Sequence, residues 1–277
     1  MTSNRDSDAP APFAPARPGG QQALRIPAPR RERMRWLRAL RALRELLATP
    51  DDTQKAMDLH LAIGARDFER SFQRFIADPT GRRLLEARAS LAAALADREA
   101  LSCMPDDSLG RAYLDYLDHN GFEPRALIEL QHAVHARWEE EEGAPPLDPV
   151  RWWFHERFTL EHDLFHVLTD YGTDGVGEAT LLAFSLAQGG GRANALLTFG
   201  AAWEMWRVLG FPWLRYDLRA WQRGRRADWL IALPWEELLP LPLDTVRALA
   251  HLEPAAIAHP GGILRGEIDE DRVFVAA

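Results

Sequence analysis

Residues 149–170 read PVRWWFHERFTLEHDLFHVLTD, an aromatic and apolar stretch with charged side chains spaced along it. This pattern predicts one long helix over residues 149–170. Most of the remaining chain shows the same helical periodicity, and the alternation typical of strands is scarce. The sequence therefore predicts an all-α fold.

Two histidines in this helix, His162 and His166, are four residues apart. Residues so spaced share one helix face, with roughly 6 Å between them, so both imidazoles can bind one metal ion. Asp163 can lean toward the same face. A glycine-rich break over residues 171–177 separates this helix from Glu178, which opens the next one and can complete a His₂-carboxylate site. Such a ligand set suits zinc or non-haem iron.

An ordinary explanation of the pair remains open, because the chain has 9 histidines among 277 residues. Against it stands the apolar surrounding, in which titratable groups are costly unless they are paired or bound to a metal. The pattern also differs from the H-E-x-x-H of zinc peptidases, since aspartate follows the first histidine where peptidases have glutamate as the general base. The sequence therefore does not indicate a peptidase.

Composition limits the class of protein. Apolar residues make up 47 % of the chain, the net charge is −8, and Cys103 is the single cysteine. The charge argues against nucleic acid as a partner, and one cysteine excludes disulfides within the chain and thiolate metal sites. The sequence has no run of 18 apolar residues and no hydrophobic signal core at its start.

The chain divides into a tail and one domain. Residues 1–30 are rich in Ala, Pro, Arg and Gly and predict a flexible, disordered tail. Residues 31–277 predict a single multi-helix domain that begins with a basic amphipathic helix over 31–48. Its apolar stripe is Met34, Leu37, Leu40, Leu43 and Leu47. This helix either lies on an anionic membrane surface or docks on the core with its arginines solvated. Further helices are expected at 51–65, 66–77, 81–96, 124–140, 178–188, 194–209, 214–223 and 244–252, and a short strand or extended tail near the end.

Several of these segments together resemble the coenzyme Q biosynthesis protein four family of ubiquinone synthesis. Residues 157–168 with Glu178 are similar to its metal motif, HD-x2-H-x11-E, and residues 105–113 to its P-x-x-S-L-G-x-x-Y element. Residues 177–189 and 224–227 are similar to later elements, and the resemblance covers roughly residues 45–255. The stretch after the second histidine, Leu168-Thr169-Asp170, departs from the family pattern.

The resemblance implies an activity and its cofactor. Family members act on polyprenylated aromatic acids, and their assigned reaction removes the carboxylate at ring carbon 1 of a 4-hydroxy-3-methoxy-5-polyprenylbenzoate, with hydroxylation there in the oxidative version. By this resemblance His162, Asp163, His166 and Glu178 are the catalytic metal ligands, although Asp163 can instead orient an imidazole. Zinc is the favoured divalent metal, with iron or cobalt as alternatives.

The remaining expectations concern substrate contacts and partners. Arg157, Arg225 and Arg226 are candidates for binding the substrate anion, although surface charge or a structural ion pair is the favoured explanation for each. An apolar groove for the prenyl tail is expected from Phe184, Leu186, Leu196, Leu197, Phe199, Trp203 and Trp206, which a plain helix core also explains. Expected partners are the polyprenylated acid, a peripheral membrane surface, other ubiquinone-biosynthesis proteins and a second copy in a homodimer. The expected location is the cytoplasmic face of a bacterial inner membrane, or else the matrix side of the mitochondrial inner membrane. A lipid-binding scaffold without catalysis is the alternative function.

Overall fold

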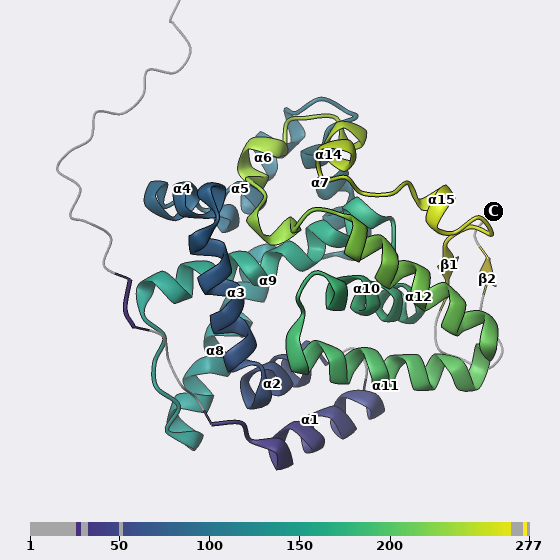
Figure 1. Ribbon diagram of the computed structural model, residues 1–277. Helices are drawn as coiled ribbons and strands as arrows, with labels where there is room; N and C mark the ends of the chain where they lie inside the picture. Colours follow the sequence, from purple (N-terminus) through teal and green to yellow (C-terminus); the bar gives the residue numbers. More distant parts are fainter. Residues whose placement is uncertain (1–25, 29–32, 50–51, 267–273, 276–277) are drawn as a thin grey trace, which may run out of the picture.

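The computed structural model describes residues 26–28, 33–49, 52–266 and 274–275 of the protein, and it confirms the all-α fold (Figure 1). Its elements are α1 (Trp36–Ala48), α2 (Thr53–Ile63), α3 (Ala65–Ala77), α4 (Pro79–Ala87), α5 (Leu91–Ala96), α6 (Arg98–Ser102), α7 (Leu109–Asn120), α8 (Pro124–Glu142), α9 (Pro149–Thr169), α10 (Gly175–Ala187), α11 (Gly191–Leu209), α12 (Phe211–Arg226), a 3₁₀ helix (Leu230–Ala232), α13 (Trp235–Leu238), α14 (Leu243–Leu249), α15 (Ala255–Ala258), β1 (Leu264–Arg265) and β2 (Phe274–Val275).

Helix α9 runs through the middle of the molecule and packs against α5, α7 and α8 (Figure 1). The Asp148 carboxylate caps its start by accepting two backbone N–H bonds, each 3.1 Å long, as expected of an N-cap aspartate. Its end follows from Asp170, whose φ of 65° is left-handed and stops the helix. The fully buried apolar side chains of α9 are Phe154, Leu160, Leu164 and Leu168. This burial on several sides makes α9 the central element of the core.

Helices α10, α11 and α12 pack against one another beside α9. The sequence predicted that the last of them ends at residue 223, before Gly224, but α12 continues to Arg226. Gly224 lies against the backbone of α10, where a Cβ atom would come within 2.4 Å of the carbonyl oxygen of Phe184. The glycine therefore permits a close approach of two helices and does not terminate one.

The predicted single helix over residues 81–96 is two helices. Arg88 takes a left-handed conformation with a φ of 52°, which ends α4. Ser90 then caps α5, its hydroxyl accepting a bond of 3.1 Å from the N–H of Ala93. The periodicity of alanine and leucine continues across the junction, so the sequence pattern gives no sign of the turn.

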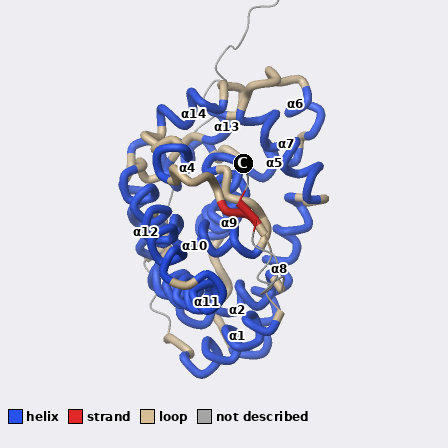
Figure 2. The backbone as a smooth tube through the Cα atoms, turned by 90° about the vertical axis from the view of Figure 1, so that its right-hand side faces the viewer, coloured by secondary structure: helices blue, strands red, loops and turns tan. Residues whose placement is uncertain are grey.

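Helix α1 packs on α2 and α11 at one end of the molecule, opposite the end formed by α6 and α14 (Figure 2). Its buried face consists of Ala39 and Ala42. Two leucines of the predicted stripe point outward, Leu37 with 86 % and Leu40 with 55 % exposure. The predicted stripe is therefore wrong for Leu37 and Leu40, whereas Met34 and Leu43 pack against the core beside the buried alanines. The helix docks on the core and still presents apolar side chains to solvent.

The two short strands pair antiparallel, with Leu264 opposite Val275. The predicted disordered tail, residues 1–30, lies outside the described residues except for 26–28. Among the helices described, none combines the length and apolar character that crossing a bilayer requires.

Candidate metal centre

The candidate centre forms where the second half of α9 faces the start of α10. His162 and His166 lie one turn apart on α9, and Glu178 stands in the first turn of α10. The carboxylate of Asp174 caps α10 by accepting a 3.0 Å bond from the N–H of Gly177. A Cβ atom on Gly177 would lie 2.1 Å from the carbonyl oxygen of Gly172, so the loop closes this tightly only with glycine there. The tight loop fixes Glu178 opposite the histidines.

The structure brings three of the four predicted ligands together. His166 Nε2 lies 3.2 Å from His162 Nε2 and 3.2 Å from a Glu178 carboxylate oxygen. His162 Nε2 lies 3.5 Å from the other oxygen of Glu178. Within the described part of the chain, these residues form the one cluster of three potential ligands, with ligand atoms within 4.8 Å of one another. Two imidazoles and a carboxylate leave one position of a tetrahedral ion open, as in catalytic zinc sites.

A contact behind His166 fixes which of its nitrogens faces inward. His166 Nδ1 lies 3.0 Å from the carbonyl oxygen of Tyr171. A carbonyl can only accept, so Nδ1 carries the proton and Nε2 keeps a lone pair in the neutral ring. Metal-binding histidines are usually oriented by such a bond. The donor atoms therefore fit a divalent metal.

Charges at the centre support the same arrangement. Burial opposes ionisation of Glu178, but the adjacent imidazoles of His162 and His166 hold the pKa of its carboxyl well below the ordinary value. Burial lowers the pKa of His162, and the bond to Glu178 outweighs it and raises that pKa. The site thus keeps an ionised carboxylate that a proton or a metal cation must balance.

Asp163 lies next to the cluster of His162, His166 and Glu178 but is not part of it. Its side chain is 8 % exposed, and one carboxylate oxygen accepts a long bond of 3.4 Å from the hydroxyl of Tyr116. The ring of Tyr116 in turn stacks on His166, with 5.8 Å between centroids. Burial raises the pKa of Asp163. The structure thus places Asp163 in a contact that orients its neighbours, while its role as a ligand stays a prediction.

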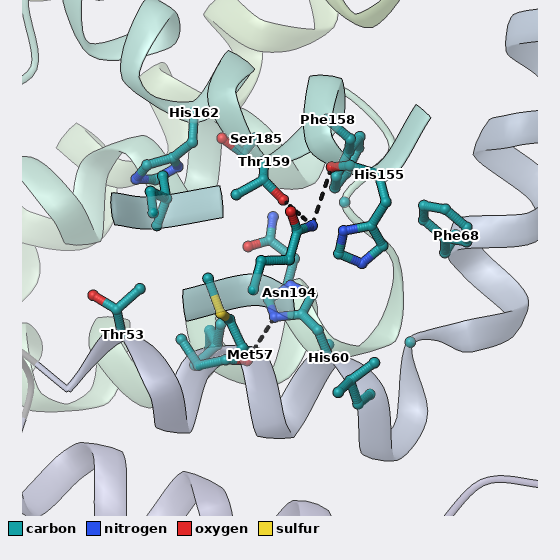
Figure 3. Close-up of a pocket in the computed structure, with 18 of the residues that line it drawn as sticks. Thr53, Met57, His60, Phe68, His155, Phe158, Thr159, His162, Ser185 and Asn194 are labelled. Atoms are coloured by element: carbon teal, nitrogen blue, oxygen red, sulfur yellow. Dashed lines mark hydrogen bonds between the residues drawn. The ribbon is translucent and has the colours of Figure 1, made fainter. Parts of the chain in front are cut away.

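The centre opens into a cavity of about 1440 Å³. Helices α1, α2, α3, α8, α9, α10 and α11 contribute to its wall, and Figure 3 shows part of this lining. The side chains of His162 and Glu178 are 44 % and 41 % exposed, whereas His166 is 1 % exposed. All three residues line the cavity, so the exposed parts of His162 and Glu178 face it. A ligand in the cavity can therefore reach the open side of the centre.

The predicted substrate arginines do not face this cavity. Arg157 is buried and donates to Glu236 and to the carbonyl oxygen of Leu233 at 2.7 and 2.6 Å. Arg225 lies over the ring of Trp221, and Arg226 pairs with Glu253. All three side chains satisfy structural contacts, so the predicted role in substrate binding is not supported by their position.

An apolar cavity is present, but most of the residues predicted to line it lie elsewhere. Of those residues, Leu197 lines the cavity. Phe184 is fully buried in the main core, while Phe199 and Trp203 are exposed on the outside of α11. Hydropathy marks these side chains as apolar but does not separate a core from a cavity wall or an outer surface. The apolar wall comes instead from α1, α2, α8 and α11, including Leu43, Leu46, Met57, Leu61, Leu130 and Leu197.

Sequence reasoning missed a polar stripe that joins the centre to the rest of the cavity. His155, Thr159, His162 and His166 all line it, at intervals of four, three and four residues along α9. Helical spacing alone would have found this stripe. His60 of α2 also lines the cavity, and no local pattern connects it to α9.

The fold and the site define an all-helical protein with a His₂-Glu centre in the wall of a large, mainly apolar cavity. The chain belongs to the family of the coenzyme Q (ubiquinone) biosynthesis protein Coq4, whose family model matches residues 28–136 and 147–256. This membership agrees with the resemblance seen in the sequence.

Individual relatives give the same result. The ubiquinone biosynthesis protein coq4, mitochondrial, of Pyrenophora tritici-repentis is 29 % identical over 187 residues, 65 % of this chain and 58 % of that protein. The corresponding protein of Phaeosphaeria nodorum has the same identity and coverage. The match thus spans 58 % of the length of these curated relatives. A crystal structure from Nostoc punctiforme PCC 73102, named for ubiquinone biosynthesis, covers 79 % of this chain and 98 % of its own at a TM-score of 0.57 and 18 % identity. That likeness supports the fold.

Proposed function

We propose that the protein acts in ubiquinone biosynthesis by removing the carboxylate at ring carbon 1 of a 4-hydroxy-3-methoxy-5-polyprenylbenzoate-type precursor. In an oxidative version, dioxygen supplies the hydroxyl oxygen that replaces the carboxylate at this carbon, and a two-electron donor reduces the second oxygen atom to water. The observation that carries the proposal is the convergence of His162, His166 and Glu178 on one point of a cavity wall. Family membership connects the chain to this pathway.

The proposed cofactor is a divalent metal held by the two imidazoles and the Glu178 carboxylate. Zinc is the first choice, and iron or cobalt would suit the oxidative version. Such an ion supplies a positive charge that binds the substrate carboxylate or phenolate and stabilises negative charge as carbon dioxide leaves. His162 and Glu178 present their exposed faces to the cavity, where they orient the acid group. The ring carbon keeps the electron pair of the broken bond and takes up a proton.

The cavity suits the remainder of such a substrate. Apolar side chains from α1, α2 and α11, among them Leu46, Met57 and Leu197, line it away from the centre. A prenyl chain placed there is removed from water, which stabilises binding by about 25 cal/mol for each Å² of apolar surface buried. The wall of the cavity thus supplies affinity, and the centre supplies the chemistry.

A membrane surface is the proposed source of so apolar a substrate. Large apolar side chains are exposed on neighbouring helices at the α1 end of the molecule, namely Leu37, Leu40, Phe199 and Trp203. Arg41 and Arg44 of α1 are exposed near them. Apolar side chains flanked by arginines favour anionic lipid surfaces. The fungal relatives are named mitochondrial, so we propose the matrix side of the inner membrane, or the cytoplasmic face of the bacterial one, as the setting.

The same exposed side chains favour a second candidate, a lipid-binding scaffold that gathers other quinone-pathway proteins without catalysis. Replacing Glu178 by alanine in cells that depend on this protein separates the two. Catalysis predicts loss of quinone and build-up of the carboxylated intermediate, whereas a scaffold tolerates the change. His132→Ala is the matched control, since His132 lies outside the cavity in a pair with Glu156. Normal quinone synthesis in the Glu178→Ala cells would contradict the catalytic proposal.

A further inference from the structure

His60 stands on α2 and faces the cavity across from α9. Figure 3 shows it below, with His155 and His162 above on the other wall. Its neighbours along α2, Met57 and Leu61, line the same cavity. The His60 side chain is accessible to water from the cavity, although protein atoms surround the site. The ring is therefore available to a ligand inside the cavity.

The backbone fixes the tautomer of this ring. His60 Nδ1 lies 2.8 Å from the carbonyl oxygen of Ala56, one helical turn earlier. Because the carbonyl can only accept, Nδ1 must carry the proton. Burial, reinforced by the nearby His162, lowers the pKa of His60 and keeps the ring neutral. His60 Nε2 then carries a lone pair and presents a hydrogen-bond acceptor.

No protein group in the described residues satisfies that acceptor. The hydrogen bond of His60 is the one to Ala56, and no carboxylate or cation pairs with the ring. Two other imidazoles of the cavity wall contact each other, with 3.3 Å between His135 Nε2 and His155 Nε2. A polar atom in a largely apolar cavity is costly unless water or a ligand pairs with it. The free acceptor of His60 therefore points to a ligand that donates.

We propose that His60 is a positioning residue that accepts a hydrogen bond from a ring hydroxyl of the substrate whose acid group lies at His162, His166 and Glu178. This inference rests on the proposed function for the nature of the substrate. In a 4-hydroxybenzoate the hydroxyl lies opposite the carboxylate, so a ring bound to α9 by its acid group directs the hydroxyl across the cavity toward α2. A neutral acceptor selects a phenol over its methyl ether, which has no proton to donate. His60 thus contributes specificity for the free hydroxyl.

The test compares two probes that differ in that proton. Binding of 3-geranyl-4-hydroxybenzoate and of its 4-methoxy ether is measured by quenching of tryptophan fluorescence. We expect the wild-type protein to bind the phenol about tenfold more tightly, the usual contribution of one hydrogen bond to an otherwise unpaired group. His60→Phe keeps an aromatic ring of similar size but no acceptor, and the preference should fall to about one. His60→Gln, which restores an acceptor, should recover part of it.

Controls separate this inference from the proposed function. His132→Phe, outside the cavity, should leave the preference unchanged. A phenol preference that persists in His60→Phe would overturn the proposal, as would the absence of any preference in the wild-type protein. Equally weaker binding of both probes to His60→Phe, with no change in the affinity ratio, would also overturn the proposal. That result would mean that the substitution changes the shape of the cavity and not a hydrogen bond. The ratio of the two binding affinities is measured without turnover. A phenol preference that depends on His60 would therefore stand even if Glu178→Ala showed that the protein is not a decarboxylase.

Discussion

His166 holds its Nδ1 proton against the carbonyl oxygen of Tyr171 at 3.0 Å, and this bond turns Nε2 toward Glu178 at 3.2 Å. Tyr171 is itself fixed, since its hydroxyl lies 2.8 Å from Nε2 of His259. The loop between α9 and α10 therefore does two things at once. It ends the helix that carries the histidines, and it supplies the backbone oxygen that orients one of them.

Replacing Asp163 by asparagine should distinguish a ligand from an orienting group. Asp163 lies outside the three-ligand cluster, so we expect Asp163→Asn to keep its metal and to lose about tenfold in affinity, as residues behind metal ligands typically do. Glu178→Gln should lose far more. Zinc affinity measured by competition with a chelator compares the two variants. Equal losses in both would show that Asp163 binds the metal directly.

The glycine before Glu178 should matter as much as the ligand itself. Gly177→Ala places a methyl group about where the Gly172 backbone already lies, and we expect it to cost about 2 kcal/mol of unfolding free energy. The shift should also displace Glu178 and weaken zinc binding. Thermal denaturation and metal content report the two effects. Gly261→Ala is the control, because nothing lies within 4 Å of its added Cβ. Unchanged zinc binding in Gly177→Ala would refute the link between loop and site.

Acidification should destabilise the protein through its buried neutral histidines. Burial lowers the pKa of His135 to about 4, and His132 adds to this. Burial likewise lowers the pKa of His155. The unfolded chain takes up these protons near pH 6.5, before the folded protein does, so stability is lost as pH falls from about 6.5 to about 4. His135→Gln should reduce this loss by about 3 kcal/mol at most.

The measurement is urea denaturation at a series of pH values. His251→Gln provides the comparison, because the side chain of His251 is 72 % exposed. If His135→Gln lost stability on acidification as steeply as the wild-type protein, His135 would not be the neutral buried group described here.

Exposed leucines of α1 should govern binding to lipid. Leu37→Ser and Leu40→Ser together should weaken sedimentation with anionic vesicles by tenfold or more, since each removes an apolar side chain worth about 1.5 kcal/mol when buried. Higher salt should weaken the binding further. Ile257→Ser, at a residue 62 % exposed on α15, is the control and should bind normally. Equal binding by all variants would remove α1 from the account.

The ligand cluster was predictable because local geometry determines it. His162 and His166 must share a face if the segment is helical, and a short loop must bring Glu178 near them. Asp163 belongs to the same stretch and lines the same cavity, but it lies outside the cluster of three, so its role as a ligand stays a prediction. The tight loop depends on Gly177 and Gly172, which the sequence showed as a glycine-rich break without revealing which contact required them.

Features that depend on distant partners could not be predicted in this way. Arg157 is a structural residue because Glu236, 79 positions later, meets it in the core. Likewise, His60 faces the site of His162 only because α2 packs on the far side of the cavity. Phe184 and Phe199 are the same residue type, yet one is fully buried and the other is exposed. Tertiary packing, which a single sequence does not display, decides these cases.

Release of labelled carbon dioxide tests the central claim most directly. The chelator-treated protein is supplied with zinc, iron(II) or cobalt(II) and a 4-hydroxy-3-methoxy-5-prenylbenzoate labelled in its carboxylate. We predict no release without metal, restored release with at least one of these ions, and none above background in Glu178→Ala with any of them. Release that continues in the metal-free protein, or that survives in Glu178→Ala, would contradict the assignment of His162, His166 and Glu178 as a catalytic metal centre.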